Sequence, residues 1–143
     1  MIRKADVTDL EQIAELEELS FAHPWDLNDL QSDYEQNPFS FFLVEEENGT
    51  IVSYADVWVT FDQAQIARIA TSPEYRRQGY GAAILNAAID LAQDEGAETM
   101  TLEVRKGNKS ARAFYEAMGF TLLHVSKKYY ENTEDALLMG IGI

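Results

Sequence analysis

The sequence has 143 residues, a formal net charge of -14 and no cysteine. A chain of this length fits one domain, and a domain of this size buries roughly 70% of the surface that its unfolded chain exposes. The absence of cysteine excludes disulfides, thiolate nucleophiles and cysteine metal sites, and the acidic balance argues against direct binding to nucleic acid.

The first half of the chain shows helix caps and a turn that predict two helices and a hairpin. Thr8 and Glu11 have the spacing of a capping box, so a helix is expected to begin there. Asp26 resembles the N-cap of a second helix, which Asn37-Pro38 ends. The Asn48-Gly49 pair marks a hairpin turn. The strands predicted in this half span 2–5, 39–46 and 51–60.

The second half alternates strands with helices and ends in two strands. An apolar stripe predicts a helix over 82–94, which Gly96 ends. Alternating apolar residues over 100–104 predict a half-buried strand. Another helix is expected to begin at Asn108 and to stop at Gly119. The remaining predicted strands span 65–71, 120–128 and 136–143.

These elements follow the order β-α-α-β-β-β-α-β-α-β-β. We therefore expect an α/β (α+β) fold in one domain over 1–143, with a mixed central sheet of about seven strands and helices on both faces. The polar start of the chain and the lack of a long apolar segment predict a cytoplasmic protein without a membrane partner. With no cysteine, His23 and His124 give no metal-ligating constellation, so no metal is expected.

A turn that suits a phosphate group follows the strand at 65–71. It reads Arg76-Arg77-Gln78-Gly79-Tyr80-Gly81 and opens the helix at 82–94. Glycines let backbone N–H groups line a concavity, and the helix N-terminus adds about half a positive charge. The arginines add full charges, so the turn predicts a pyrophosphate site, although a plain glycine turn is the alternative. The spacing is neither that of G-x-G-x-x-G nor that of a P-loop, which disfavours a nucleotide-binding protein.

The motif Arg76-x-x-Gly79-x-Gly81 resembles the coenzyme A motif of the GNAT acetyltransferases, Arg/Gln-x-x-Gly-x-Gly/Ala. The resemblance covers essentially the whole chain and implies the GNAT fold. Shorter motifs resemble the RimI branch of that family: His23-Pro24-Trp25, Leu102-Glu103-Val104-Arg105, Asn108, residues 113–120, Tyr129-Tyr130 and Glu134-Asp135-Ala136. The branch implies an acetyl-CoA-dependent N-acetyltransferase that modifies the N-terminal alanine of a small-subunit ribosomal protein.

The resemblance also implies roles for individual residues. The family's glutamate base falls on Glu103 and its tyrosine acid on Tyr115. A strand bulge that hydrogen-bonds the pantetheine arm has its counterpart at 69–71, and an asparagine that contacts pantetheine falls on Asn108. The implied cofactor-binding residues are Ile69, Ala70, Thr71, Arg76, Arg77, Gln78, Gly79, Tyr80, Gly81 and Asn108.

These residue types suit acetyl transfer from a thioester to an amine. The amine must be neutral to attack, and an α-amine, with a pKa near 8, loses its proton far more readily than a lysine does. A carboxylate such as Glu103 can complete that deprotonation, and Tyr115 can give the leaving thiolate a proton or a hydrogen bond. The alternatives are a surface ion pair for Glu103, aromatic packing for Tyr115 and a helix N-cap for Asn108.

Four further residues are candidates for the acceptor side. Glu17 lies on an apolar helical arc and faces either the acceptor amine or the helix edge. Trp25 and Tyr130 either shape the acceptor cleft or pack as ordinary aromatic residues. Arg68 stands where asparagine is usual in the RimI branch, so it is expected to alter the acceptor cleft.

Two other functions compete with protein N-terminal acetylation. A small amine, such as a polyamine or an amino sugar, is the first alternative acceptor, and the net charge of -14 suits it equally well. A non-catalytic acyl-CoA-binding module is the second. That module would be expected to lack Glu103 or Tyr115, and both are present.

Overall fold

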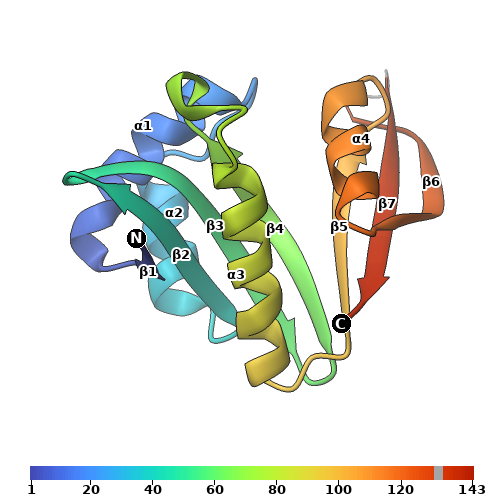
Figure 1. Ribbon diagram of the computed structural model, residues 1–143, viewed down its shortest axis with the longest axis horizontal. Coiled ribbons are helices and arrows are strands. Elements are labelled where there is room, and N and C mark those ends of the chain that lie inside the picture. The colour runs from blue at the N-terminus through green and yellow to red at the C-terminus, as the bar shows by residue number, and fades with distance from the viewer. Residues whose placement is uncertain (131–133) are drawn as a thin grey trace.

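The computed structural model describes the backbone of residues 1–130 and 134–143, and the side chains of these residues except 128–130 (Figure 1). Its elements are β1 (Ile2–Lys4), α1 (Leu10–Ser20), α2 (Leu27–Gln36), β2 (Ser40–Glu47), β3 (Thr50–Thr60), β4 (Gln63–Thr71), α3 (Tyr80–Asp94), β5 (Thr99–Arg105), α4 (Lys109–Ala117), β6 (Thr121–Tyr130) and β7 (Glu134–Gly142). Two single 3-10 turns, Val7–Asp9 and Pro73–Tyr75, precede α1 and α3. The predicted element order is confirmed.

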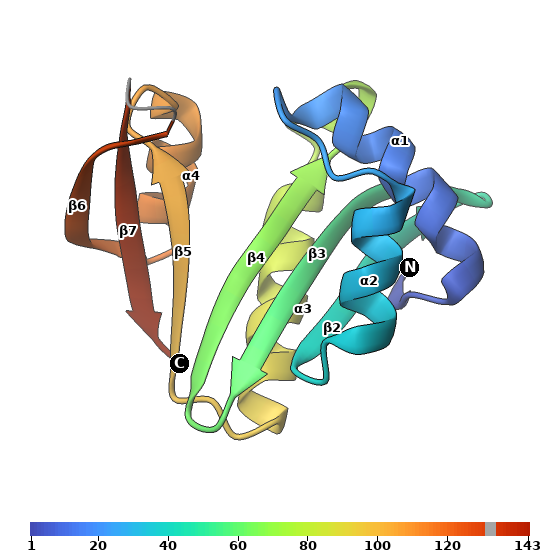
Figure 2. The same ribbon diagram turned by 180° about the vertical axis from the view of Figure 1, so that it is seen from behind.

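The strands form one seven-stranded sheet in the order β1-β2-β3-β4-β5-β7-β6. Neighbouring strands in this sheet run antiparallel, except β4 and β5, which are parallel. These two strands pair only where Gln63–Gln65 faces Thr99–Thr101, and beyond that point they diverge (Figures 1 and 2). The second half of β4 therefore turns an unpaired main-chain edge toward β5.

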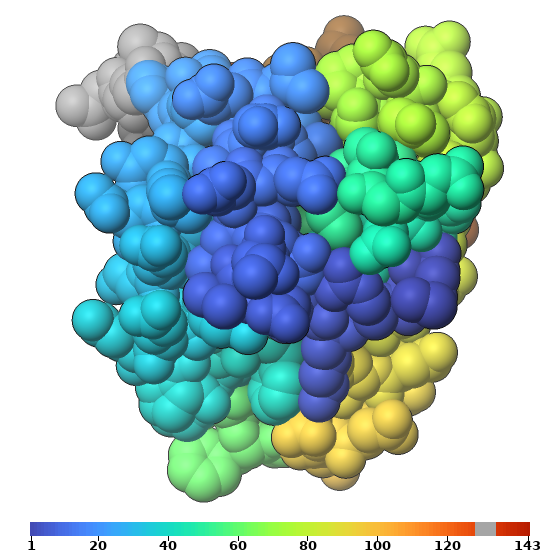
Figure 3. Space-filling model, turned by 90° about the vertical axis from the view of Figure 1, so that its left-hand side faces the viewer, coloured from blue at the N-terminus to red at the C-terminus, as the bar shows by residue number. Residues whose placement is uncertain are grey.

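Helices cover both faces of the sheet, as the sequence predicts. On one face, Ile84 and Leu85 of α3 join Tyr115 of α4 in a buried cluster. On the other, Ile13 of α1 and Leu30 of α2 belong to a second buried cluster. Figure 2 shows α1 and α2 in front of the sheet, and Figure 3 shows the blue segments of both helices covering one side of the molecule. No helix in the described part of the chain is long and apolar enough to span a membrane.

The predicted capping box at the first helix is wrong in position. Asp6 is the N-cap of the 3-10 turn, and its carboxylate accepts from the backbone N–H of Thr8, while the Asp9 carboxylate accepts from the N–H of Asp6. Asp9 also forms an ion pair with Arg3 of β1, with an Nη1–Oδ2 distance of 2.7 Å. The helical segment therefore has its N-cap at Asp6, two residues earlier than Thr8.

The predicted strand bulge lies at Ala67 rather than at 69–71. The β3–β4 register passes from Val57–Ile66 to Asp56–Arg68, so Ala67 is an extra residue without a partner on β3. An extra residue reverses the side-chain alternation that follows it. Ile66 therefore packs into the cluster under α3, whereas Arg68 points to the face that α1 and α2 cover.

Candidate functional site

The turn between β4 and α3 has the backbone conformation that a phosphate site requires. Arg77 and Gly79 both have positive φ angles, +62° and +89°. Helix α3 begins directly after Gly79, and no side chain among the described residues caps it. Its first N–H groups therefore remain open to an anion, at the positive end of the helix dipole.

The side chains of this turn flank the open N–H groups. Arg76 and Arg77 are exposed, and Arg76 donates from Nε to the carbonyl of Thr71 at 3.1 Å. Gln78 donates to the carbonyl of Glu74 at 3.1 Å. Both arginine side chains lie exposed near the start of the helix, where their positive charges suit a pyrophosphate.

Tyr80 and Gly81 both have close neighbours at the start of helix α3. Tyr80 packs edge-on against Tyr75 with ring centroids 5.8 Å apart. A Cβ at Gly81 would lie 3.6 Å from Phe114 of α4 and 3.8 Å from the hydroxyl of Thr71. The turn, the end of β4 and helix α4 therefore meet at Gly81.

Residues 69–71 lie on the part of β4 that does not pair with β5. On the β3 side Ile69, Ala70 and Thr71 pair regularly with residues 53–55. On the β5 side their main-chain groups have no strand partner among the described residues. Such an edge can bind an extended arm that carries amide groups, which is how a strand recognises a peptide-like ligand.

Glu103 lies on β5 opposite Leu138 of β7, and its side chain is exposed. Among the described residues it has no ion-pair or hydrogen-bond partner, so the alternative of a surface ion pair finds no support there. Leu102 and Val104, its neighbours along the strand, point into the cluster under α3. Glu103 therefore faces the opposite side, the side of α1 and α2.

Tyr115 is buried under α4, with 8% of its surface exposed. Its ring packs edge-on against Phe114 and Phe120, with centroids 5.2 Å and 5.9 Å away. Burial raises the pKa of the Tyr115 phenol to about 12, so the hydroxyl keeps its proton at neutral pH. The hydroxyl makes no hydrogen bond to any described residue and is available as a donor.

Glu103 and Tyr115 thus lie on opposite faces of the sheet. Tyr115 shares its buried cluster with Leu102 and Val104, which alternate with Glu103 along β5. Between the two faces runs the edge where β4 and β5 separate. Glu103 itself lies beyond the paired part of β5, which ends at Thr101.

Asn108 caps helix α4, as one of its two predicted roles requires. Its side-chain oxygen accepts from the N–H of Ala111 at 3.2 Å, and the residue is exposed. The loop before it is held by Glu134, which accepts from the N–H of Gly107 at 2.8 Å and pairs with Arg105 at 3.3 Å. The sequence analysis missed this role of Glu134, because the two segments are distant in sequence.

Glu17 differs from both of its predicted roles. It is neither at the helix edge nor open to an acceptor, because its side chain is fully buried, at 0% exposure. Arg68 donates to both carboxylate oxygens, Nε to Oε2 at 3.1 Å and Nη2 to Oε1. The hydroxyl of Tyr54 also donates to the Glu17 carboxylate. The backbone N–H of Trp25 donates to the same carboxylate at 2.8 Å.

Trp25 and Arg68 therefore come together, as two residues predicted for the acceptor side. The Arg68 guanidinium carbon lies 4.9 Å from the Trp25 ring centroid and 4.1 Å from that of Phe21. The sequence analysis missed Phe21 and Tyr54 as parts of this cluster. Tyr130 was the fourth candidate, and its side chain lies outside the described residues.

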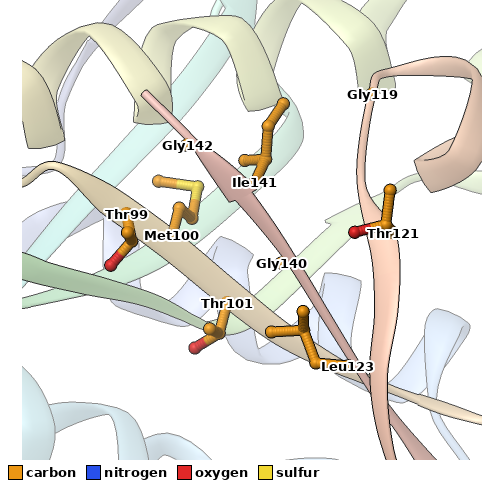
Figure 4. A pocket seen from close by; sticks show the side chains of 9 residues that line it. All are labelled: Thr99, Met100, Thr101, Gly119, Thr121, Leu123, Gly140, Ile141 and Gly142. Atoms are coloured by element: carbon orange, nitrogen blue, oxygen red, sulfur yellow. The ribbon is translucent and has the colours of Figure 1, made fainter.

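The described surface has two hollows, and of the predicted site residues only Trp25 lines either of them. One of about 360 Å³ lies between β5, β7 and β6 (Figure 4), and none of the predicted site residues line it. Another of about 350 Å³ includes Trp25 and Trp58 in its wall. Within the described part of the chain, no group of three or more histidine, aspartate or glutamate side chains could hold a metal ion.

The fold and this arrangement define a class of protein. Residues 9–120 match the acetyltransferase (GNAT) family, and the chain belongs to that family. It is an acyltransferase, and enzymes of the family use acetyl-CoA as acetyl donor. The predicted family and fold are confirmed.

Individual members of the family are similar to this chain over nearly its whole length. The ribosomal protein bS18-alanine N-acetyltransferase of Escherichia coli (strain K12) is 34% identical over 145 residues, covering 99% of this chain and 97% of that protein. The protein of the same name from Haemophilus influenzae is 31% identical over 144 residues, covering 98% and 97%. The crystal structure of the ribosomal-protein-S18-alanine N-acetyltransferase from Escherichia coli is similar with a TM-score of 0.92 at 33% identity, covering 100% of this chain and 93% of that one. The resemblance to the RimI branch is thereby confirmed.

Proposed function

We propose that this protein transfers the acetyl group of acetyl-CoA to the N-terminal α-amine of alanine in a small-subunit ribosomal protein, as one domain spanning 1–143. The names of its full-length relatives support this acceptor. The observation that carries the mechanism is the position of Glu103 and Tyr115 on opposite faces of the edge where β4 and β5 separate.

In this proposal acetyl-CoA binds from the turn to the strand edge. The N–H groups at the start of α3, with Arg76 and Arg77, hold the pyrophosphate. The pantetheine amides pair with the free edge of β4 at 69–71, and Asn108 contacts the arm. The thioester then lies between β4 and β5, and a backbone N–H of that edge stabilises the oxyanion of the tetrahedral intermediate.

The acceptor amine arrives on the opposite face, beside Glu103. Glu103 removes a proton from the ammonium group, directly or through a water, and the neutral nitrogen attacks the thioester carbon. The C–N bond forms, the C–S bond breaks and the nitrogen gives up a further proton to solvent, so the complete reaction releases one net proton. Tyr115 hydrogen-bonds the departing thiolate on the α4 face, where the sulfur takes up a proton to leave as coenzyme A.

Unacetylated small-subunit ribosomal proteins provide the test of the acceptor. They are incubated with the enzyme and acetyl-CoA, and mass spectrometry identifies which N-termini gain an acetyl group. We expect acetylation of one protein with N-terminal alanine. Acetylation at lysine side chains alone, or at no ribosomal protein, contradicts the proposal. Because a ribosomal acceptor is synthesised in the cytoplasm, we expect the enzyme to act there.

A further inference from the structure

The guanidinium of Arg68 is held rigidly on the acceptor face of the sheet. The bulge at Ala67 turns Arg68 toward α1, where its fork meets both oxygens of the buried Glu17. The rings of Phe21 and Trp25 lie over the guanidinium at 4.1 Å and 4.9 Å. A bidentate ion pair with aromatic rings over the guanidinium fixes both the position and the plane of that group.

Part of this guanidinium remains available to a ligand. A guanidinium carries five N–H hydrogens, and Glu17 accepts one from Nε and one from Nη2. The Arg68 side chain is 18% exposed, and within the described part of the chain none of its nitrogens is buried without a partner. Part of the guanidinium is therefore accessible from the α1–α2 side of the sheet.

Arg68 and Glu103 both lie where β4 and β5 have separated. They lie on the neighbouring strands β4 and β5, and both point to the α1–α2 face. Pairing of these strands stops at Gln65 and Thr101, just before the two residues. An amine that reaches Glu103 from this face therefore approaches the sheet on the same side as the Arg68 guanidinium.

We propose that Arg68 is a specificity-determining residue whose free N–H hydrogens donate to the carbonyl oxygen next to the attacking amine. The proposal rests on the proposed function and deepens it. A peptide N-terminus carries that carbonyl one carbon away from its nitrogen, whereas an alkylamine such as a polyamine has none. A hydrogen-bond donor that is already held in position stabilises a bound substrate with a carbonyl oxygen. It leaves a substrate without that oxygen less tightly bound. Arg68 thus selects peptide α-amines over simple alkylamines.

A competition between two acceptors tests this role. One is a peptide that begins with alanine, and the other is its twin with a carbon–carbon double bond in place of the first peptide bond. This change removes the carbonyl and the amide N–H, and the rise in amine pKa that it also causes is the same for every enzyme variant. Mass spectrometry of the two acetylated products gives the ratio of their kcat/KM values. Since both compete for the same enzyme, the ratio does not depend on how much of a variant is folded.

Three variants are compared with the wild type. Arg68→Lys keeps a cation opposite Glu17 but removes the planar fork. The double variant E17Q/R68Q replaces the buried ion pair by two neutral amides, so no lone charge is left buried. Arg112→Lys is the matched control, because this arginine pairs with Glu116 on exposed α4 at 3.2 Å.

We expect the wild type and Arg112→Lys to show the same ratio of kcat/KM values in favour of the peptide. In both variants at position 68 this ratio should fall about tenfold, which is the effect of one charge-assisted hydrogen bond. An unchanged ratio in both of these variants contradicts the role of Arg68, even if their rates fall. If the wild type binds acetyl-CoA and acetylates neither acceptor, the proposed function itself fails, and the role of Arg68 fails with it.

Discussion

The hydroxyl of Tyr115 illustrates how burial sets the chemistry of one side chain. Phe114 and Phe120 exclude water from the ring, which raises the pKa of the Tyr115 phenol to about 12. A thiol has a pKa of about 8.5, so complete transfer of the Tyr115 proton to the leaving thiolate is uphill. A hydrogen bond to the developing negative charge on sulfur is therefore expected to be its main contribution.

Replacement of Tyr115 by phenylalanine removes this hydrogen bond and keeps the packing. We expect kcat to fall by about tenfold to a hundredfold, while the dissociation constant of acetyl-CoA stays the same. Steady-state rates and a direct binding titration measure the two effects. Tyr34→Phe is the control, because its hydroxyl bonds the distant carbonyl of Ala5. Full activity of Tyr115→Phe contradicts the acid role.

The base role of Glu103 predicts a pH-dependent deficit. In Glu103→Gln, kcat/KM for an alanine peptide should fall about a hundredfold at pH of about 6.5, where most of the α-amine is protonated. The deficit should shrink as pH rises past the amine pKa of about 8, because solvent has then removed the proton already. Rates across this range measure it, with the exposed Glu98→Gln as control. An equal deficit at every pH argues for a structural role instead.

At the scale of elements, the turn before α3 depends on left-handed backbone. Gly79 has a φ of +89°, a conformation that a Cβ disfavours by about 1–2 kcal/mol. Gly81 has an ordinary φ, and a Cβ there meets Phe114 and Thr71 only at normal contact distances. The two glycines of one motif therefore have different requirements.

This difference predicts opposite results for two alanine substitutions. Gly79→Ala should weaken acetyl-CoA binding by about tenfold, because the strained turn no longer aims its N–H groups at the pyrophosphate. Gly81→Ala should bind acetyl-CoA nearly as the wild type does. Calorimetric titration with coenzyme A compares them. Equal affinities of the two variants would show that the turn conformation is not what binds the phosphate.

The elements differ in how well the sequence predicts them. Local signals gave the second helix, the hairpin and α4, because the N-caps at Asp26 and Asn108 and the Asn48-Gly49 turn act within a few residues. The bulge at Ala67 leaves no such signal, since residues 65–71 read as a regular strand. The Glu17–Arg68 ion pair follows from that bulge, so it could not be predicted either.

At the scale of the whole molecule, the sheet separates two binding faces. Helices α3 and α4 cover the face that carries Tyr115, and α1 and α2 cover the face of Glu103. The sequence predicts both layers and, through the alternation along β5, the outward face of Glu103. It does not predict that β4 and β5 separate after three paired residues, because this depends on the packing of whole elements.

The stability of the whole molecule should depend on Asp56 of β3. It is fully buried, and desolvation, together with a hydrogen bond that the protonated carboxyl donates to neighbouring Asp33, raises the pKa of the Asp56 carboxyl to about 9. Ser40 donates to this carboxyl at 2.6 Å. The folded protein therefore keeps a proton that the unfolded chain loses near pH 4, and folding stability is lost as pH rises toward 9.

The substitution Asp56→Asn tests this linkage, because an amide cannot ionise. Between pH of about 6 and 8.5, the free energy of unfolding of the wild type should fall by about 1–3 kcal/mol, and that of the variant should stay nearly level. Urea unfolding at each pH measures both, with the exposed Asp62→Asn as control. Parallel pH profiles of wild type and Asp56→Asn contradict the raised pKa. The pKa of Asp33 is lowered, so its titration changes the folding stability only at pH values below the ordinary pKa of an aspartate. It therefore does not affect the pH range of this test.

The central claim, transfer of acetyl to a peptide α-amine, is tested most directly by thiol release from acetyl-CoA with three separate acceptors. These are an alanine-starting peptide with a free N-terminus, its Nα-blocked twin that contains lysine, and spermidine. The account predicts turnover with the free N-terminus alone, since only that amine combines a pKa near 8 with an adjacent carbonyl. Turnover with spermidine or the blocked peptide in place of the free N-terminus would contradict it.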